Sequence, residues 1–187
     1  MATRGIILEG DDLLAKKSRP ITQFDQRLFT LLDDMRETLL ENDGLGLAAV
    51  QVGALRRVFV AVDLSDEGQE EILEFINPEI VETEGEQNNI EGCLSMPGIY
   101  GFTKRPERVK VRAKNREGED FEVEGDGLFA RELMHEYDHL DGILFSKHVI
   151  RYLTEEEVEA MNSSSGDGED DHYGNLKLEG TENEAVE

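Results

Sequence analysis

The chain of 187 residues contains a single cysteine, so it cannot form an internal disulfide bond. This favours a reducing compartment, because small oxidised domains usually rely on several cysteine pairs. The sequence also lacks any apolar run of the roughly 18–20 residues that a membrane-spanning helix needs, and its first residues lack the apolar stretch of a secretory signal. We therefore expect a cytoplasmic protein that does not bind a membrane.

Basic residues are scarce: 19 Lys and Arg stand against 43 Asp and Glu, which gives a formal net charge of −24. There is no basic patch with interleaved aromatic residues, so direct nucleic-acid binding is not expected. The acidity is compatible with a salt-rich cytoplasm, in which repulsion between like charges is screened, or with ordinary solubility.

The acidity is densest at the C-terminal end, where residues 154–187 carry twelve acidic side chains against Lys177 alone. Thr154 is placed to cap a short helix through Glu157. Beyond about Met161 we expect disorder, because few apolar groups are available to offset the loss of chain entropy. The sequence thus predicts one folded, catalytic domain over 1–153 and an acidic tail over 154–187.

Apolar periodicity predicts two helices and several strands within the folded part. A helical stripe covers 25–41. A second helix begins near 126 and runs to about Leu140, after which Gly142 ends it. The predicted strands cover 57–63, 75–81, 109–113 and 121–123.

The second predicted helix carries the stretch His135-Glu136-Tyr137-Asp138-His139, which has the pattern of a metal site. Residues four apart lie on the same face of a helix, so His135 and His139 can reach one ion. Glu136 is then placed to act on a water in an open position of that metal.

A catalytic metal usually has three protein ligands, so a third must come from elsewhere in the chain. The best candidate is Cys93, the only cysteine. A lone cysteine is most often a small buried apolar residue. Here the neighbouring Gly92 and Gly98 favour a constrained turn that presents the thiolate instead.

A third segment, Gly44-Leu45-Gly46-Leu47-Ala48-Ala49-Val50-Gln51, is rich in small residues. It is not a phosphate loop, because no Lys-Ser or Lys-Thr follows, and the spacing of a dinucleotide-binding loop is absent. The glycines allow a peptide-like ligand to approach the backbone closely. Gln51 offers an amide N–H to an oxygen that gains negative charge.

Together these three segments resemble the three motifs of the peptide deformylase family, in the same order and at similar separations. The resemblance covers about residues 5–150. It implies an α+β fold in which antiparallel strands pack around a central metal-binding helix. It also implies hydrolytic removal of the N-formyl group from the first methionine of newly made polypeptides, with release of formate.

The resemblance implies ligands and a proton carrier. Cys93, His135 and His139 would hold one divalent metal per chain, with Fe²⁺ the expected ion and Zn²⁺ or Ni²⁺ able to replace it. Glu136 would move protons to and from the reacting groups.

Further positions would contact the substrate. The Gln51 side chain and the Leu94 backbone N–H would stabilise the oxyanion. Substrate binding is expected at Gly44, Leu45, Gly46, Glu91 and Leu128. The implied partners are formyl-Met nascent polypeptides and, transiently, the ribosome. Met134, Tyr100 and Gly10 depart from the family's common pattern, which affects expectations of fine substrate preference more than of the reaction.

Two other classes of protein remain possible from the residues alone. A metalloprotease would share the chemistry of Glu136 but would need neither Cys93 nor the glycine-rich segment. A structural zinc site would need a fourth ligand, for which only His148 lies close in the sequence.

Overall fold

The computed structural model describes residues 2–64 and 71–164, in which eight strands form two antiparallel sheets. The larger sheet has the order β1-β2-β3-β6-β7, and the smaller has the order β4-β5-β8. The strands are β1 (Gly46–Ala48), β2 (Val58–Val62), β3 (Ile72–Glu84), β4 (Gln87–Gly92), β5 (Tyr100–Arg105), β6 (Arg108–Lys114), β7 (Asp120–Asp126) and β8 (Val149–Tyr152). The α-helices are α1 (Gln26–Glu41), α2 (Gly127–Leu140) and α3 (Glu155–Ser164), and the 3₁₀ helices are η1 (Asp12–Ala15), η2 (Ala49–Val52) and η3 (Phe145–Lys147).

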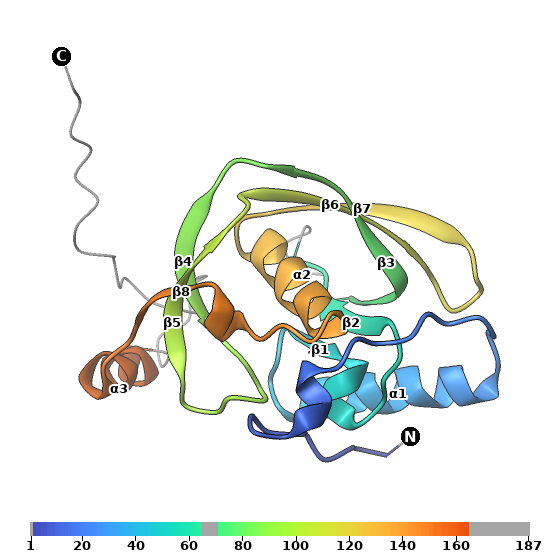
Figure 1. Cartoon of the computed structure of the whole chain (residues 1–187), viewed down its shortest axis with the longest axis horizontal. Coiled ribbons are helices and arrows are strands. Elements are labelled where there is room, and N and C mark those ends of the chain that lie inside the picture. The colour runs from blue at the N-terminus through green and yellow to red at the C-terminus, as the bar shows by residue number, and fades with distance from the viewer. Residues whose placement is uncertain (1, 65–70, 165–187) are drawn as a thin grey trace.

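Helix α2 lies in the middle of this arrangement (Figure 1). It contacts β1, β2, β6 and β7 of the larger sheet, and its polar face is turned toward the turn that follows β4. Its apolar face joins one core cluster through Phe129, Ala130, Leu133 and Leu140. The expected α+β fold, with antiparallel strands around a central helix, is confirmed.

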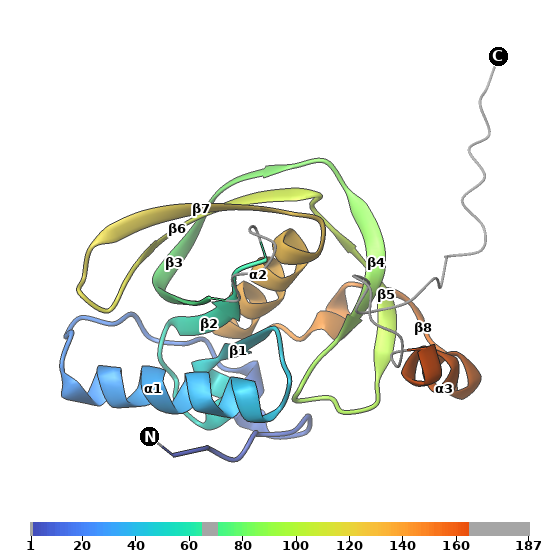
Figure 2. The same ribbon diagram turned by 180° about the vertical axis from the view of Figure 1, so that it is seen from behind.

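Helix α1 lies on the other side of β1 and β2, and Figure 2 shows it at the outside of the fold. The Asp25 side chain caps it by accepting hydrogen bonds from the backbone N–H groups of Arg27 and Leu28. Its apolar stripe forms the second core cluster with β1 and β2. Its buried apolar residues recur at helical spacing, so the helix predicted over 25–41 is confirmed; they are Leu28, Leu31, Leu32, Met35 and Leu39.

The predicted strands are present, and three of them, β3, β6 and β7, are longer than expected. Strand β3 extends well beyond 75–81, because its second half pairs with β6. Its register with β6 shifts after Ile76, where Asn77 has a φ of +50° and Pro78 has no N–H to donate. The Asn77 side chain secures this irregularity by bonding to the backbone N–H and C=O of Ile21 at 2.7 and 2.8 Å.

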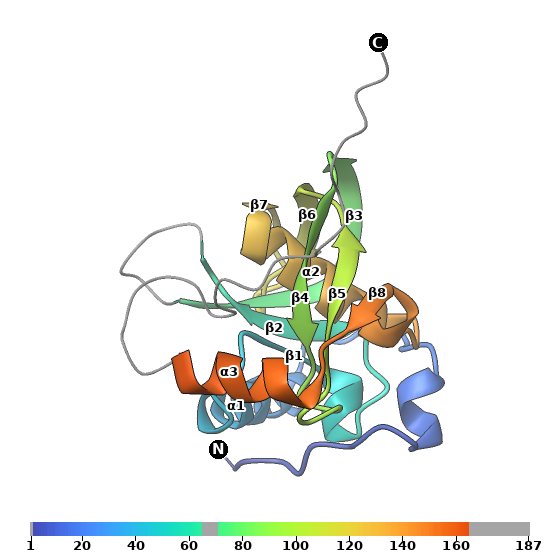
Figure 3. The ribbon, with the colours of Figure 1, turned by 90° about the vertical axis from the view of Figure 1, so that its left-hand side faces the viewer.

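The three-stranded sheet was not predicted from the sequence. Strand β4 reads QNNIEG and has only Ile90 as a large apolar residue, so it shows no apolar alternation. Figure 3 shows this sheet beside α2, with α3 next to it at the outside of the fold.

Thr154 and Glu157 exchange hydrogen bonds at the start of α3. The disorder that we expect beyond about Met161 falls almost entirely on residues that the structure does not describe. Among the residues that it does describe, none of the helices combines the length and the apolar character that a membrane span requires.

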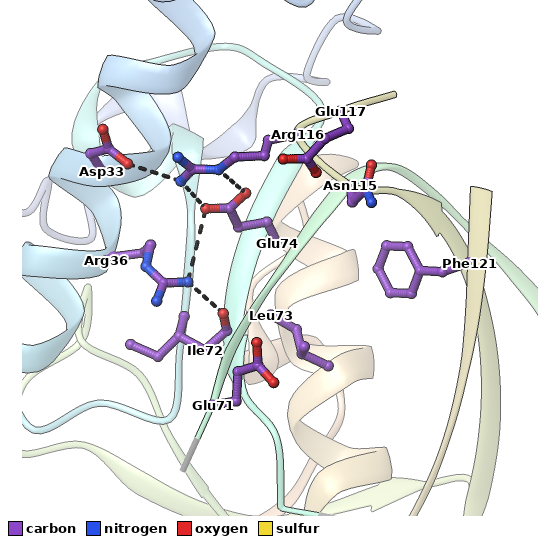
Figure 4. A pocket seen from close by; sticks show the side chains of 10 residues that line it. All are labelled: Asp33, Arg36, Glu71, Ile72, Leu73, Glu74, Asn115, Arg116, Glu117 and Phe121. Carbon is purple, nitrogen blue, oxygen red and sulfur yellow. Dashed lines mark hydrogen bonds and ion pairs between the residues drawn. The ribbon is translucent and has the colours of Figure 1, made fainter. Parts of the chain in front are cut away.

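A cavity of about 550 Å³ lies between α1, the start of β3 and the turn from β6 to β7 (Figure 4). Arg116 crosses it and binds Asp33 of α1 at 2.9 Å together with both carboxylate oxygens of Glu74. Arg36 donates to the Ile72 carbonyl oxygen at 2.5 Å. Arg116 and Arg36 pair with the acidic groups Asp33 and Glu74 across this cavity and tie α1 to β3, so we interpret it as part of the scaffold.

Replacing Arg116 by Gln is expected to leave the mostly buried Glu74 carboxylate with weaker partners. The loss should be about 1 kcal/mol of unfolding free energy, which lowers the melting temperature by about 2–4 °C. Arg108→Gln is the matched control, because Arg108 and Glu84 form an exposed pair. Equal melting temperatures for the two variants would contradict this account.

Candidate metal centre and active site

Cys93 lies close to His135 and His139 of α2, and the ligand atoms of the three residues are all within 4.8 Å of one another. Cys93 Sγ lies 3.3 Å from His139 Nε2, which in turn lies 3.2 Å from His135 Nε2. The two histidines are one helical turn apart, and Cys93 lies in the turn that follows β4. Three atoms that converge in this way can bind a single ion.

The other ring nitrogen of His135 is held by a buried carboxylate. His135 Nδ1 lies 3.0 Å from Glu91 Oε2. Arg105 donates to both oxygens of Glu91, at 2.6 and 3.0 Å, and Thr103 Oγ1 donates at 2.6 Å. Arg105 also reaches Asp138 of α2 at 2.6 Å. This network fixes the ring of His135 so that Nε2 faces the centre.

The charges around the centre shift the pKa values of its members. Burial opposes the charged form of His135, but the Cys93 thiolate and Glu91 outweigh it and raise the pKa of His135 well above its usual value. Burial, His135 and Arg105 lower the pKa of His139 well below the usual value. His139 is therefore neutral near pH 7, as a metal ligand must be, and an ion would compete with the proton on His135.

Gln51 of η2 faces the cysteine, and one hydrogen bond fixes which end of its amide does so. The backbone N–H of Ala48 donates to Gln51 Oε1 at 2.8 Å, so Nε2 points the other way. Gln51 Nε2 lies 3.6 Å from Cys93 Sγ and 3.2 Å from Ser95 Oγ. The amide donor expected from the sequence is thus placed at the centre.

Glu136 is buried on α2, and its Oε2 has no hydrogen-bond partner among the described residues. Burial, the nearby Glu132 carboxyl and the Cys93 thiolate raise the pKa of Glu136 well above its usual value, against the effect of His135. A thiolate, two imidazoles and an unpaired carboxylate oxygen fit a catalytic divalent ion with an open position for water.

The predicted substrate-binding residues lie at β1 and just before it, at the end of β4 and at the start of α2. Gly46 belongs to β1, whose only partner strand among residues 2–64 and 71–164 is β2, so that no described strand pairs with its other edge. Leu94 packs against Gly44, where a Cβ would come within 2.9 Å of its Cδ1 atom. Leu45 and Leu128 are both half-buried, at the starts of β1 and α2. Glu91 contacts the Nδ1 atom of His135, on the side of the ring that is turned away from Cys93 and His139.

His148 does not join the three ligands. Its Nε2 lies 3.0 Å from Asp138 Oδ2, outside hydrogen-bonding geometry. Within residues 2–64 and 71–164 the Cys93–His135–His139 set has no fourth His, Cys, Asp or Glu, which disfavours a closed structural zinc site.

Several residues of the site were not predicted from the sequence, among them Arg105, Thr103 and Ser95. Nothing in the local pattern of Arg105 and Thr103 distinguishes them, because they reach the site through the pairing of β4 with β5, whereas Ser95 lies in the motif that carries Cys93 and could have been named from it. Tyr100, where the family's pattern is broken, lies with its ring against Gly92.

An α+β fold with a Cys-His-His centre beside a buried glutamate defines a metal-dependent hydrolase. The model of the polypeptide deformylase family matches residues 3–154. The chain belongs to this family, whose reaction is the removal of the N-formyl group from nascent polypeptides.

Relatives and solved structures agree with this assignment. The chain is 55% identical to a peptide deformylase of Acetivibrio thermocellus over 159 residues, which cover 85% of this chain and 91% of the relative. It is 45% identical to peptide deformylase 1 of Bacillus subtilis over 161 residues, covering 86% and 99%. The crystal structure of peptide deformylase from Thermotoga maritima superposes with a TM-score of 0.74 at 39% identity, over 80% of this chain and 99% of that one.

Replacing Glu91 by Gln is expected to weaken binding of a divalent metal by about 10- to 100-fold, because it removes the charge that orients His135 and balances Arg105. Competition with a chromogenic chelator measures this affinity. Glu86→Gln is the control, since Glu86 precedes the same strand but pairs with Lys104 on the surface. Unchanged affinity in Glu91→Gln would show that the network does not support the metal site.

Proposed function

We propose that the Cys93–His135–His139 centre performs deformylation with Glu136 as the residue that moves protons. Glu136 takes a proton from the attacking water and later delivers one to the amine that leaves. The observation that carries this role is the buried Glu136 Oε2, which has no partner in the described residues next to three converging metal ligands. A divalent ion held there would activate the water and polarise the formyl oxygen.

Two hydrogen-bond donors are proposed to stabilise the oxygen that becomes negative during hydrolysis. Gln51 Nε2 is aimed toward the centre by the Ala48 bond to its other end. The backbone N–H of Leu94 directly follows Cys93, in the turn closed by the Met96 N–H bond to the Cys93 carbonyl oxygen at 2.9 Å. Donors fixed before the reaction need no reorganisation when the charge forms.

The free edge of β1 is proposed to bind the substrate backbone through Gly46, as an added strand. Gly44, Leu45 and Leu128 would then line the space for the methionine side chain, which Glu91 would border from behind His135. A solved relative at 32% identity and a TM-score of 0.74, the class I type b enzyme of Acinetobacter baumannii, carries bound Met-Ala-Ser. This supports a peptide substrate that begins with methionine.

The wider assignments are also proposals. We infer that residues 1–153 form the catalytic domain and that residues 154–187 take no part in the chemistry. The enzyme would work in the cytoplasm, close to ribosomes that release formyl-Met chains. The proposed native ion is Fe²⁺, with Zn²⁺ and Ni²⁺ as substitutes.

Glu136→Gln is expected to keep its metal and to lose more than about 10²-fold of the rate of formate release from a formyl-Met peptide, since it removes a general acid–base. Metal content and formate are measured on the same preparation. Glu156→Gln, an exposed change on α3, should leave the rate unaltered. Near-normal turnover by Glu136→Gln at full metal occupancy would contradict the proposed role.

The Fe²⁺ form is expected to lose activity in air faster than the Ni²⁺ form, because a partly exposed thiolate ligand and a redox-active ion are both open to oxidation. Time courses of formate release after exposure to air, with anaerobic samples as the control, measure this difference. Equal decay of the two forms would argue against a thiolate-bound redox-active iron.

A further inference from the structure

Ser95 lies two residues after Cys93, in the turn that follows β4, and none of the roles above involves it. Its side chain is fully buried, so its hydroxyl is removed from water and needs a partner within the protein. That partner is Gln51 of η2, whose Nε2 atom donates to Ser95 Oγ across 3.2 Å. The buried hydroxyl of this turn therefore contacts the side chain that is proposed to stabilise the oxyanion.

The amide group of Gln51 is held at both of its ends. It carries one carbonyl oxygen and two N–H donors. The backbone N–H of Ala48 donates to Oε1 at 2.8 Å, and Ser95 Oγ accepts a bond from Nε2. Nε2 also lies 3.6 Å from Cys93 Sγ, so its second N–H is the one that faces the centre. Ala48 and Ser95 thus fix the plane of the amide and leave a single donor turned toward the reaction.

Main-chain bonds from the N-terminal segment keep Gln51 and Ser95 close together. The backbone N–H of Ile7 donates to the Gln51 carbonyl oxygen, and that of Glu9 donates to the Ser95 carbonyl oxygen, each at 2.8 Å. One short segment therefore holds both partners, although they are 44 residues apart in the sequence. Because these two bonds involve only main-chain atoms, loss of the Ser95 hydroxyl leaves them in place.

We propose that Ser95 is a positioning residue for deformylation, whose hydroxyl holds the Gln51 amide with its remaining N–H directed at the oxygen that becomes negative. The proposal rests on the proposed role of Gln51. The terminal torsion of a glutamine side chain has broad minima, so an amide without this bond can rotate away. A donor that is fixed before the charge forms acts mainly in the transition state, so the contribution of Ser95 falls on kcat more than on KM.

The test is a double-mutant cycle on the Ni²⁺-loaded full chain with a short formyl-Met peptide as substrate. It compares the wild type, Ser95→Ala, Gln51→Ala and the variant that carries both changes. Ser18→Ala is the matched control, because Ser18 is also buried but its Oγ has no hydrogen-bond partner among the described residues. Metal content and melting temperature are recorded for each variant.

We expect Ser95→Ala to lose about fivefold or more in kcat, as for one lost hydrogen bond, with KM within about twofold and the metal retained. Gln51→Ala should lose about 10²-fold in kcat. Once the Gln51 amide is absent, the Ser95 hydroxyl has nothing to hold, so the double variant should stay within about twofold of Gln51→Ala. Ser18→Ala should match the wild type.

A kcat of Ser95→Ala within about twofold of the wild type would overturn the proposal, and this comparison stands by itself if Gln51→Ala does not fold. A double variant about fivefold or more below Gln51→Ala would also overturn it, since the hydroxyl would then act through another group. Loss of the metal from Ser95→Ala would show instead that Ser95 supports the metal site. A normal rate in Gln51→Ala would overturn the oxyanion role proposed for Gln51, and the role of Ser95 with it.

Discussion

The contact between the buried Glu91 carboxylate and the imidazole ring of His135 is the interaction on which the rest of this structure depends. Glu91 comes from the three-stranded sheet and His135 from the central helix, and their contact at 3.0 Å joins the two. A charge buried in this way is tolerated only when it is paired and fully hydrogen-bonded. Arg105 and Thr103 satisfy that condition, and the β4–β5 pairing places them there.

Helix α2 carries an unusual number of polar side chains that are buried, and the same need for partners applies to them. The helix turns one face into the apolar core and carries His135, Glu136, Asp138 and His139 on buried positions elsewhere. So many buried polar groups on one helix are costly unless they serve a purpose. A divalent ion between Cys93 and the two histidines would balance the thiolate and the nearby carboxylates, so the fold and the metal site are expected to support each other.

The sequence predicted the parts of the fold that have strong local patterns. The stripe of α1 and the β6–β7 hairpin can be seen directly in their periodicity, and the three candidate ligands, which the structure brings together, can be seen in their motifs. The sheet formed by β4, β5 and β8 could not be found in this way, because its strands are short and β4 is mostly polar. Arg105 could not be predicted either, because it reaches the site only through the pairing of β5 with β4.

In the proposed site, one thiolate and two imidazoles hold a single ion with a position left open. X-ray absorption spectroscopy of the zinc-loaded protein tests it most directly, because sulfur and nitrogen ligands lie at different distances from zinc. The account predicts one sulfur at about 2.3 Å, two imidazole nitrogens at about 2.0–2.1 Å and at least one further light atom. A zinc ion without a sulfur ligand, or one with four protein ligands, would contradict it.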